Sequence, residues 1–132
     1  MSIELKMLLF TVALFFVQLL AQVFAAFIQQ GLGYLASARD EWQAPTGIPG
    51  RIERSYFNLL ETMPAFAALV LAVLYTGNAN ETTALGAQIY FWGRVLYLPA
   101  YISGIPYIRT LIWIASTAGL VLILWEMLKL AF

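Results

Sequence analysis

The chain contains no cysteine and no histidine, and few of its side chains carry a charge. Without these two residue types the protein has no disulfide framework, no thiolate zinc site, and no Cys or His side chain for catalysis. Charged residues make up 11% of the 132 residues, and 7 basic side chains balance 7 acidic ones. Nucleic-acid binding depends on an excess of positive charge. The sequence therefore predicts neither a metal site nor a nucleic-acid partner.

Apolar residues dominate what remains. They make up 62% of the sequence, whereas a soluble domain is nearer about one half apolar. Such a chain is also too hydrophobic to be disordered. The composition predicts an integral membrane protein, with residues 1–132 forming one transmembrane domain. Its expected spans, taken from the continuous apolar stretches, are about 5–35, 55–75, 85–102 and 108–130.

The spans are expected to be helices. A segment that crosses lipid must satisfy its own backbone hydrogen bonds, which leaves helices or a closed barrel. Barrel strands alternate between apolar and polar residues, but these stretches are continuous. A secretory signal peptide is a poorer interpretation of the first stretch, because its apolar core would be only about 7–15 residues long. The predicted fold is an all-α bundle of four transmembrane helices.

The arginines predict an orientation. Basic residues near span ends mark the cytoplasmic side of a membrane. The first and third connections carry most of them, namely Arg39, Arg51, Arg54 and Arg109. The opposite side has only Lys6 and Lys129. We expect cytoplasmic first and third loops in a multi-pass membrane protein.

One face of the second span is polar. Arg51, Arg54, Asn58 and Glu61 follow one another at intervals of three, four and three residues. At about 100° per residue they fall within an arc of roughly 80°. Ionisable groups in membrane helices are costly and usually mark function. A purely structural bundle does not require so many charges on one face, so this face predicts a binding site.

Two other spans carry polar stripes of their own. The third span contributes Tyr90, Arg94, Tyr97 and Tyr101, and the first span contributes Gln18, Gln22 and Gln29. Hydrogen bonds between helices are a sufficient explanation for the glutamines.

The polar inventory of the second span suits a particular ligand chemistry. Guanidinium groups bind carboxylates through two parallel hydrogen bonds. A carboxylate such as that of Glu61 accepts an ammonium group, and an amide such as that of Asn58 binds a peptide group. Glutathione carries all three ligand groups. A nearby arginine would lower the pKa of its thiol below the free value of about 8.5, giving a nucleophile without a protein cysteine.

The run from Arg51 to Phe66 resembles a family signature. Its Arg-x-x-Arg-x-x-x-Asn-x-x-Glu-x-x-Pro pattern is similar to that of the MAPEG superfamily, the membrane-associated proteins in eicosanoid and glutathione metabolism. The block from Arg94 to Tyr101, followed by Arg109, resembles the third span and following loop of that family. Arg39 falls where the family often has an arginine at the end of its long first helix. The pattern is closest to that of small bacterial members, and this resemblance implies a bacterial inner membrane.

The resemblance implies a homotrimer with glutathione bound between adjacent subunits on the cytoplasmic side. The implied glutathione-binding residues are Arg39, Arg51, Arg54, Asn58, Glu61, Tyr97 and Tyr101. The implied catalytic residue is Arg109, or alternatively Arg94, which would stabilise the thiolate. The expected activity is that of a glutathione-dependent transferase or peroxidase. Its substrate would be a small lipophilic electrophile or hydroperoxide that arrives from the membrane lipids.

Other functions stay open at this point. A non-enzymatic lipid-binding or scaffold protein of the same fold would bind apolar ligands and ignore glutathione. A small transporter or channel subunit would need a continuous polar path, whereas the polar stripes favour one half of the membrane. The thiol cosubstrate is equally open, because another low-molecular-weight thiol would suit the same groups.

Overall fold

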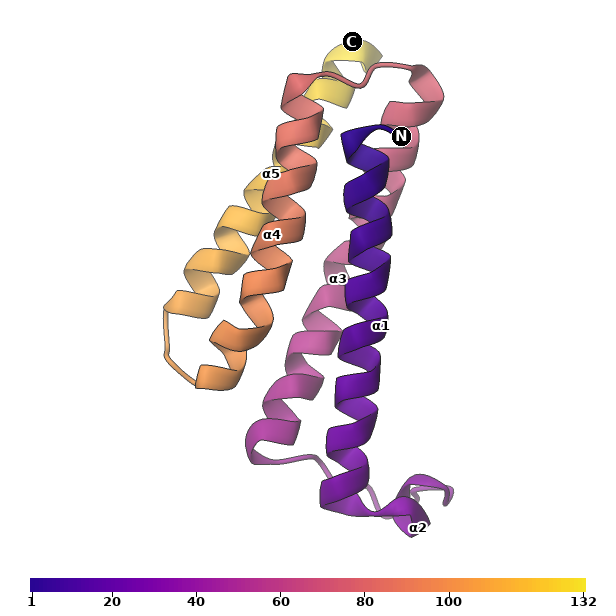
Figure 1. Cartoon of the computed structure of the whole chain (residues 1–132), viewed down its shortest axis with the longest axis vertical. Helices are drawn as coiled ribbons and strands as arrows, with labels where there is room; N and C mark the ends of the chain where they lie inside the picture. The colour runs from indigo at the N-terminus through magenta and orange to yellow at the C-terminus, as the bar shows by residue number, and fades with distance from the viewer.

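A computed structural model describes residues 1–132, all of them in helices or their connections. The helices are α1 (Ile3–Gln30), α2 (Leu32–Leu35), α3 (Gly47–Thr76), α4 (Glu81–Ser103) and α5 (Ile108–Ala131). Four of them are long and run up and down alongside one another, with both chain termini at the same end (Figure 1). The short α2 lies at the opposite end, beyond α1. The all-α prediction is confirmed.

The helix ends differ from the expected spans at two places. The first helix ends at Gln30 rather than near residue 35, because Gly31 takes a positive φ of 82° and α2 follows as a separate turn. The helix α3 begins at Gly47, well before the apolar stretch that starts near residue 55. Pro49 fits this early start, since proline is tolerated in a first turn. Hydrophobicity therefore marks the membrane-embedded part of α3 but not its whole length.

Three helices, α1, α3 and α5, are long and apolar enough to cross a membrane. The helix α4 does not meet the same criterion, although its 23 residues give a length of about 35 Å at the usual helical rise. Its more polar side chains explain the difference, and Tyr90, Arg94 and Tyr97 among them are buried in the bundle. A fourth span formed by α4 remains a prediction, in which these polar groups face the other helices.

Small residues bring α4 and α5 into close contact. A Cβ atom on Gly86 would lie 2.6 Å from the carbonyl oxygen of Gly119. Close approach of backbones through small residues is typical of membrane helix pairs. One turn earlier on α5, the Ser116 hydroxyl donates to the Tyr90 carbonyl oxygen at 3.1 Å. These contacts fix the rotation of α4 and thereby the direction in which Arg94 points.

The apolar core occupies the half of the bundle that contains the chain termini. Its centre consists of Phe66, Val70, Val73, Ala87 and Ile123, none of which is exposed. At this end the buried Glu4 carboxylate accepts a hydrogen bond from the Thr83 hydroxyl. The Asn80 side chain caps α4 and also donates to Glu126 at 3.1 Å. The terminal half thus combines the apolar core with polar contacts at its end, whereas Arg51, Arg54 and Arg109 lie in the opposite half.

Candidate functional site

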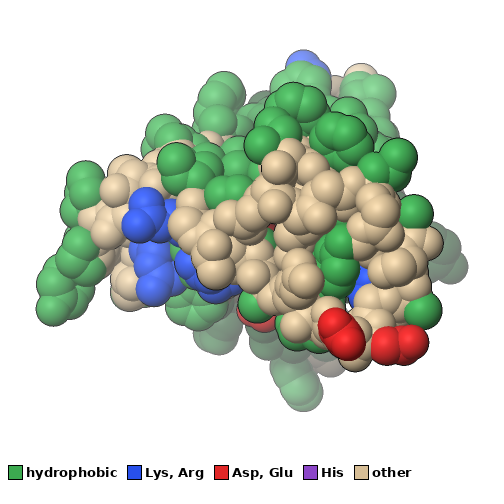
Figure 2. All heavy atoms as spheres, turned by 90° about the horizontal axis from the view of Figure 1, so that it is seen from below, with side chains coloured by type: hydrophobic (Ala, Val, Ile, Leu, Met, Phe, Trp, Pro, Cys, Tyr) green, Lys and Arg blue, Asp and Glu red, His purple; other side chains and the backbone are tan.

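Three arginines surround one cavity at the end opposite the termini. Arg51 and Arg54 from α3 and Arg109 from the start of α5 line a cavity of about 270 Å³. The remaining wall consists of Tyr101 and the turn between α4 and α5, namely Gly104, Ile105 and Pro106. Figure 2 views the molecule from this end and shows a cluster of Lys and Arg side chains on the surface. We refer to the cavity as the arginine pocket.

Two of these arginines are held by α4. The Arg51 Nη1 donates to the carbonyl oxygen of Ile102 at 2.9 Å, near the end of that helix. The Arg54 Nε donates to the Tyr101 hydroxyl at 3.2 Å. Arg109 lies over the ring of the same tyrosine, with its guanidinium carbon 4.6 Å from the ring centre. Tyr101 therefore positions two guanidinium groups through its hydroxyl and its ring.

The turn after α4 leaves room for Arg51. Gly104 ends α4 in the left-handed conformation with φ of 71°. A Cβ atom at this position would lie 2.9 Å from the Arg51 guanidinium. Both the backbone conformation and the close approach therefore favour glycine here.

A second polar layer lies deeper in the bundle. Arg94 is almost completely buried, and its Nη1 donates to the Asn58 amide oxygen at 2.8 Å. The guanidinium carbon lies 4.3 Å from the centre of the Tyr97 ring. Its Nε and Nη2 have no hydrogen-bond partner in the protein. Glu61, on the next turn of α3, is exposed and forms no ion pair within the chain.

The structure groups most of the predicted site residues. Arg51, Arg54, Tyr101 and Arg109 meet in the arginine pocket. The Asn58–Arg94 pair lies deeper along the same two helices, with Tyr97 against the guanidinium. The expected polar face of α3 thus contacts the expected polar stripe of α4.

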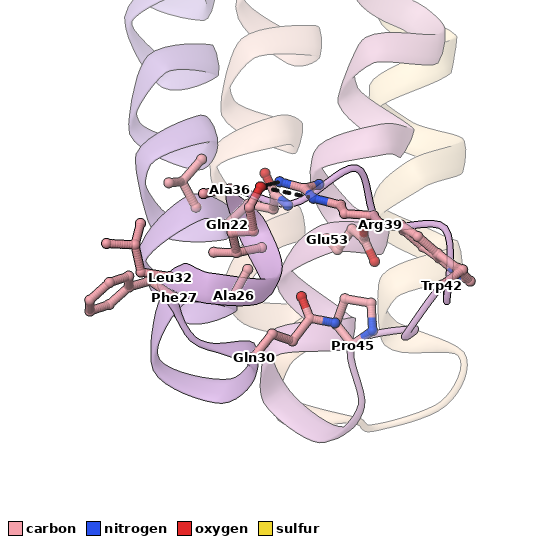
Figure 3. Close-up of a pocket in the computed structure, with 12 residues that line it drawn as sticks. Gln22, Ala26, Phe27, Gln30, Leu32, Ala36, Arg39, Trp42, Pro45 and Glu53 are labelled. Atoms are coloured by element: carbon pink, nitrogen blue, oxygen red, sulfur yellow. Dashed lines mark hydrogen bonds between the residues drawn. The ribbon is translucent and has the colours of Figure 1, made fainter.

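Arg39 lies apart from this group. It lines a separate cavity of about 380 Å³ at the end of α1, together with Gln22, Trp42 and Glu53 (Figure 3). Its Nε and Nη2 donate to the Leu35 carbonyl oxygen at 3.1 and 2.8 Å. Within one chain, Arg39 therefore does not contribute to the arginine pocket.

Sequence reasoning did not single out the buried Ser55, and it predicted interhelical hydrogen bonds for Gln18 that the structure does not show. Ser55 is fully buried on α3 between the two polar layers, and its hydroxyl has no protein partner. Gln18 belongs to the stripe expected to form interhelical hydrogen bonds, but its amide has no partner either. Gln29 of the same stripe does form such bonds, to Thr46. The position of Ser55, next to Arg54 and one turn before Asn58, could have indicated that it belongs to the site.

Fold and site together define a class of protein. It is a helical membrane protein whose apolar half contains the termini and whose other half carries an arginine-lined pocket backed by a buried Arg–Asn pair. The chain belongs to the MAPEG family, whose family model matches residues 7–129. No curated protein matches the sequence significantly.

Proposed function

We propose that the protein is a membrane-embedded, glutathione-dependent transferase or peroxidase that acts on lipophilic electrophiles or hydroperoxides. The observation that carries this proposal is the arginine pocket, in which Arg51, Arg54 and Arg109 face one cavity at the end of the bundle. Membership of the MAPEG family supports a glutathione-related activity in a membrane.

The pocket suits an anionic ligand. None of its arginines forms an ion pair within the chain, where the one such pair joins Lys129 to Glu126. Neighbouring guanidinium groups repel one another, and a carboxylate between them relieves that repulsion. Guanidinium groups also match the geometry of a carboxylate through paired hydrogen bonds. The two carboxylates of glutathione therefore fit Arg51 and Arg54.

The deeper layer supplies the other complementary groups. The Asn58 amide oxygen is engaged by Arg94, so its NH₂ group remains free to donate to a peptide carbonyl. The unpaired carboxylate of Glu61 suits the α-ammonium group of the tripeptide. Tyr97 and Tyr101, which contact Arg94 and Arg54, would orient the ligand. The donor set of these residues thus matches the chemistry of glutathione.

Arg109 is the proposed catalytic residue. It lies in the first turn of α5, lines the arginine pocket and has its guanidinium group over the ring of Tyr101. Glutathione supplies a thiol, and a positive charge beside it favours the thiolate. In a transferase reaction the sulfur forms a bond to an electrophilic carbon, whose bond to its leaving group breaks. Arg94 is the alternative, because its Nε and Nη2 are free.

A second copy of the chain is needed to complete the site. Its volume of about 270 Å³ lies below the usual range of ligand sites, about 300–1,000 Å³. Glu61 is exposed on the side of α3, and a carboxylate facing lipid is costly. Contact with a neighbouring subunit would cover Glu61 and enlarge the site. We propose the homotrimer implied by the family resemblance, with Arg39 supplied to a neighbouring subunit's site.

The test is a titration of the purified, detergent-solubilised protein with glutathione, followed by ultraviolet difference spectroscopy. We expect a saturable thiolate band. The matched control is Lys6→Ala, which removes a positive charge at the opposite end and should leave the band unchanged. If neither binding nor a band appears with an intact trimer, the glutathione proposal is wrong.

A second candidate function is lipid binding without catalysis. An apolar groove of about 490 Å³ lies on the outer side of α5, lined mostly by hydrophobic side chains. Its residues are Trp113, Ile114, Thr117, Ala118, Val121 and Leu122. A lipid-binding protein would retain a fluorescent fatty acid in this groove, and Val121→Trp would displace it. Glutathione would then have no effect on that binding.

A further inference from the structure

Three buried polar side chains in the arginine-rich half have hydrogen-bonding atoms without protein partners. They are both amide atoms of Gln18 on α1, the hydroxyl of Ser55 on α3, and Nε and Nη2 of Arg94 on α4. Gln18 and Ser55 are 0% exposed and Arg94 is 1% exposed. Buried polar groups in proteins are almost always hydrogen-bonded, to protein or to ordered water, because leaving them unsatisfied is costly.

Gln18 and Ser55 lie close to one level of the bundle, and the Arg94 side chain is bound about one turn away. The Phe15 ring of α1 contacts the Tyr56 ring of α3, with centroids 5.8 Å apart. Since α1 and α3 are antiparallel, this contact places Gln18 and Ser55 within one helical turn, about 5.4 Å, of the same level. Ser55 also precedes by one turn the Asn58 side chain that receives the Arg94 hydrogen bond. The interior between α1, α3 and α4 is therefore polar at this level.

The cavity beside Arg39 approaches this level along α1. Its wall includes Gln22, one turn beyond Gln18 on the same face of α1, and Glu53 of α3. Figure 3 shows Gln22 and Glu53 facing the same cavity from their two helices. The cavity lies at the end of the bundle, where Arg39 and Trp42 also line it. Along α1, this cavity therefore ends one helical turn, about 5.4 Å, from the level of Gln18.

We propose that Gln18, Ser55 and Arg94 hold an internal cluster of water molecules, with Gln18 on the side nearest the cavity beside Arg39. A buried water typically makes about three hydrogen bonds. Here it would accept from the free N–H groups of Arg94, donate to the Gln18 amide oxygen, and exchange hydrogen bonds with the Ser55 hydroxyl. Gln18 and Ser55 are then positioning residues, which keep the Arg94 guanidinium oriented toward Asn58. This inference does not depend on the identity of the ligand.

X-ray hydroxyl-radical footprinting tests this proposal directly, because radicals form where water is present. The full-length protein in detergent contains a matched pair of buried tyrosines on α4. Tyr97 is 2% exposed and contacts Arg94, whereas Tyr90 is 1% exposed and belongs to the apolar core. We expect Tyr97 to be modified several-fold faster than Tyr90. Equal rates for the two tyrosines in the wild-type protein would overturn the proposal.

Substitutions then assign the water to the proposed residues. Gln18→Leu should lower the modification rate of Tyr97 to that of Tyr90. Gln29→Leu is the matched control, since it removes an amide of the same stripe that is already bonded to Thr46, and Tyr97 should keep its wild-type rate. Ser55→Ala serves the same purpose as Gln18→Leu if the latter does not fold. A fast Tyr97 that neither substitution slows would show that Gln18 and Ser55 do not hold the water.

Discussion

The Arg94 guanidinium and the Asn58 amide oxygen form a 2.8 Å hydrogen bond between α4 and α3, at a level where Arg94 is almost completely buried. A buried guanidinium is stable only when its N–H groups are satisfied. The pair therefore fixes the orientation of both side chains. It also decides which group of Asn58 is left for a ligand, namely the NH₂ group.

The first prediction concerns the link between these two residues. Asn58→Leu removes the one protein acceptor of the Arg94 guanidinium, which should lower the free energy of unfolding by about 3 kcal/mol. Combining it with Arg94→Met removes the buried charge as well and should restore most of that loss. Denaturant unfolding in detergent, followed by tryptophan fluorescence, measures both variants. Additive losses in the double variant would show that the two side chains do not interact.

The second prediction concerns binding in the arginine pocket. Arg54→Ala removes a charged donor and should raise the Kd for glutathione by about 10–100-fold, as expected for a charge-assisted hydrogen bond. Isothermal titration calorimetry gives the Kd. Tyr101→Phe removes only the hydroxyl that receives the Arg54 Nε, so a smaller increase is expected. An unchanged Kd in Arg54→Ala would remove this residue from the site.

The third prediction separates binding from thiol activation. Arg109→Leu should leave glutathione binding within a few-fold of wild type but raise the pKa of the bound thiol, because a positive charge stabilises the thiolate. The pH at which the thiolate band reaches half height should therefore be higher in the variant. Arg94→Leu is the parallel measurement. If only Arg94→Leu shifts the midpoint, Arg94 and not Arg109 stabilises the thiolate.

The fourth prediction concerns Arg39, which lies outside the arginine pocket of its own chain. In the proposed trimer it contributes to a neighbouring subunit, so Arg39→Ala and Arg54→Ala should each weaken glutathione binding. Mixed trimers, made by co-expressing the two variant chains, contain some interfaces at which both Arg39 and Arg54 are intact. Binding at wild-type affinity should return for that fraction of sites. No recovery in the mixed trimers would contradict a shared site.

The fifth prediction concerns the contact between α4 and α5. Gly86→Ala places a methyl group within 2.6 Å of the Gly119 carbonyl oxygen and should destabilise the protein by about 1–3 kcal/mol. Gly33→Ala is the control, because that position has open space and no strained backbone. Thermal unfolding in detergent compares the two. Equal melting temperatures would show that the helices separate readily at this point.

Much of this protein follows from local sequence patterns. Continuous apolar stretches predicted the long helices, since a chain in lipid has few ways to satisfy its backbone. The spacing of Arg51, Arg54 and Asn58 placed them on one face of α3, because helical periodicity depends only on nearby residues. The family resemblance seen in the run from Arg51 to Phe66 was likewise confirmed by the match over residues 7–129.

The helix ends were less predictable, and for a physical reason. Hydropathy reports which residues suit lipid, whereas a helix can continue through polar residues beyond it. The early start of α3 at Gly47 was missed on this account. The break at Gly31 was missed because glycine by itself does not indicate a positive φ.

Only the tertiary structure decided which polar groups meet. The sequence by itself determined the helices and their polar faces, but Arg54 and Tyr101 are far apart along the chain and become partners through the register between α3 and α4. That register is set by packing between the two helices, including the contact of the Phe66 ring with the Tyr90 ring. The packing of the whole bundle separates Arg39 from the arginine pocket and buries Gln18 with Ser55. Periodicity is a local property of the chain, whereas register is the joint result of contacts across the whole bundle.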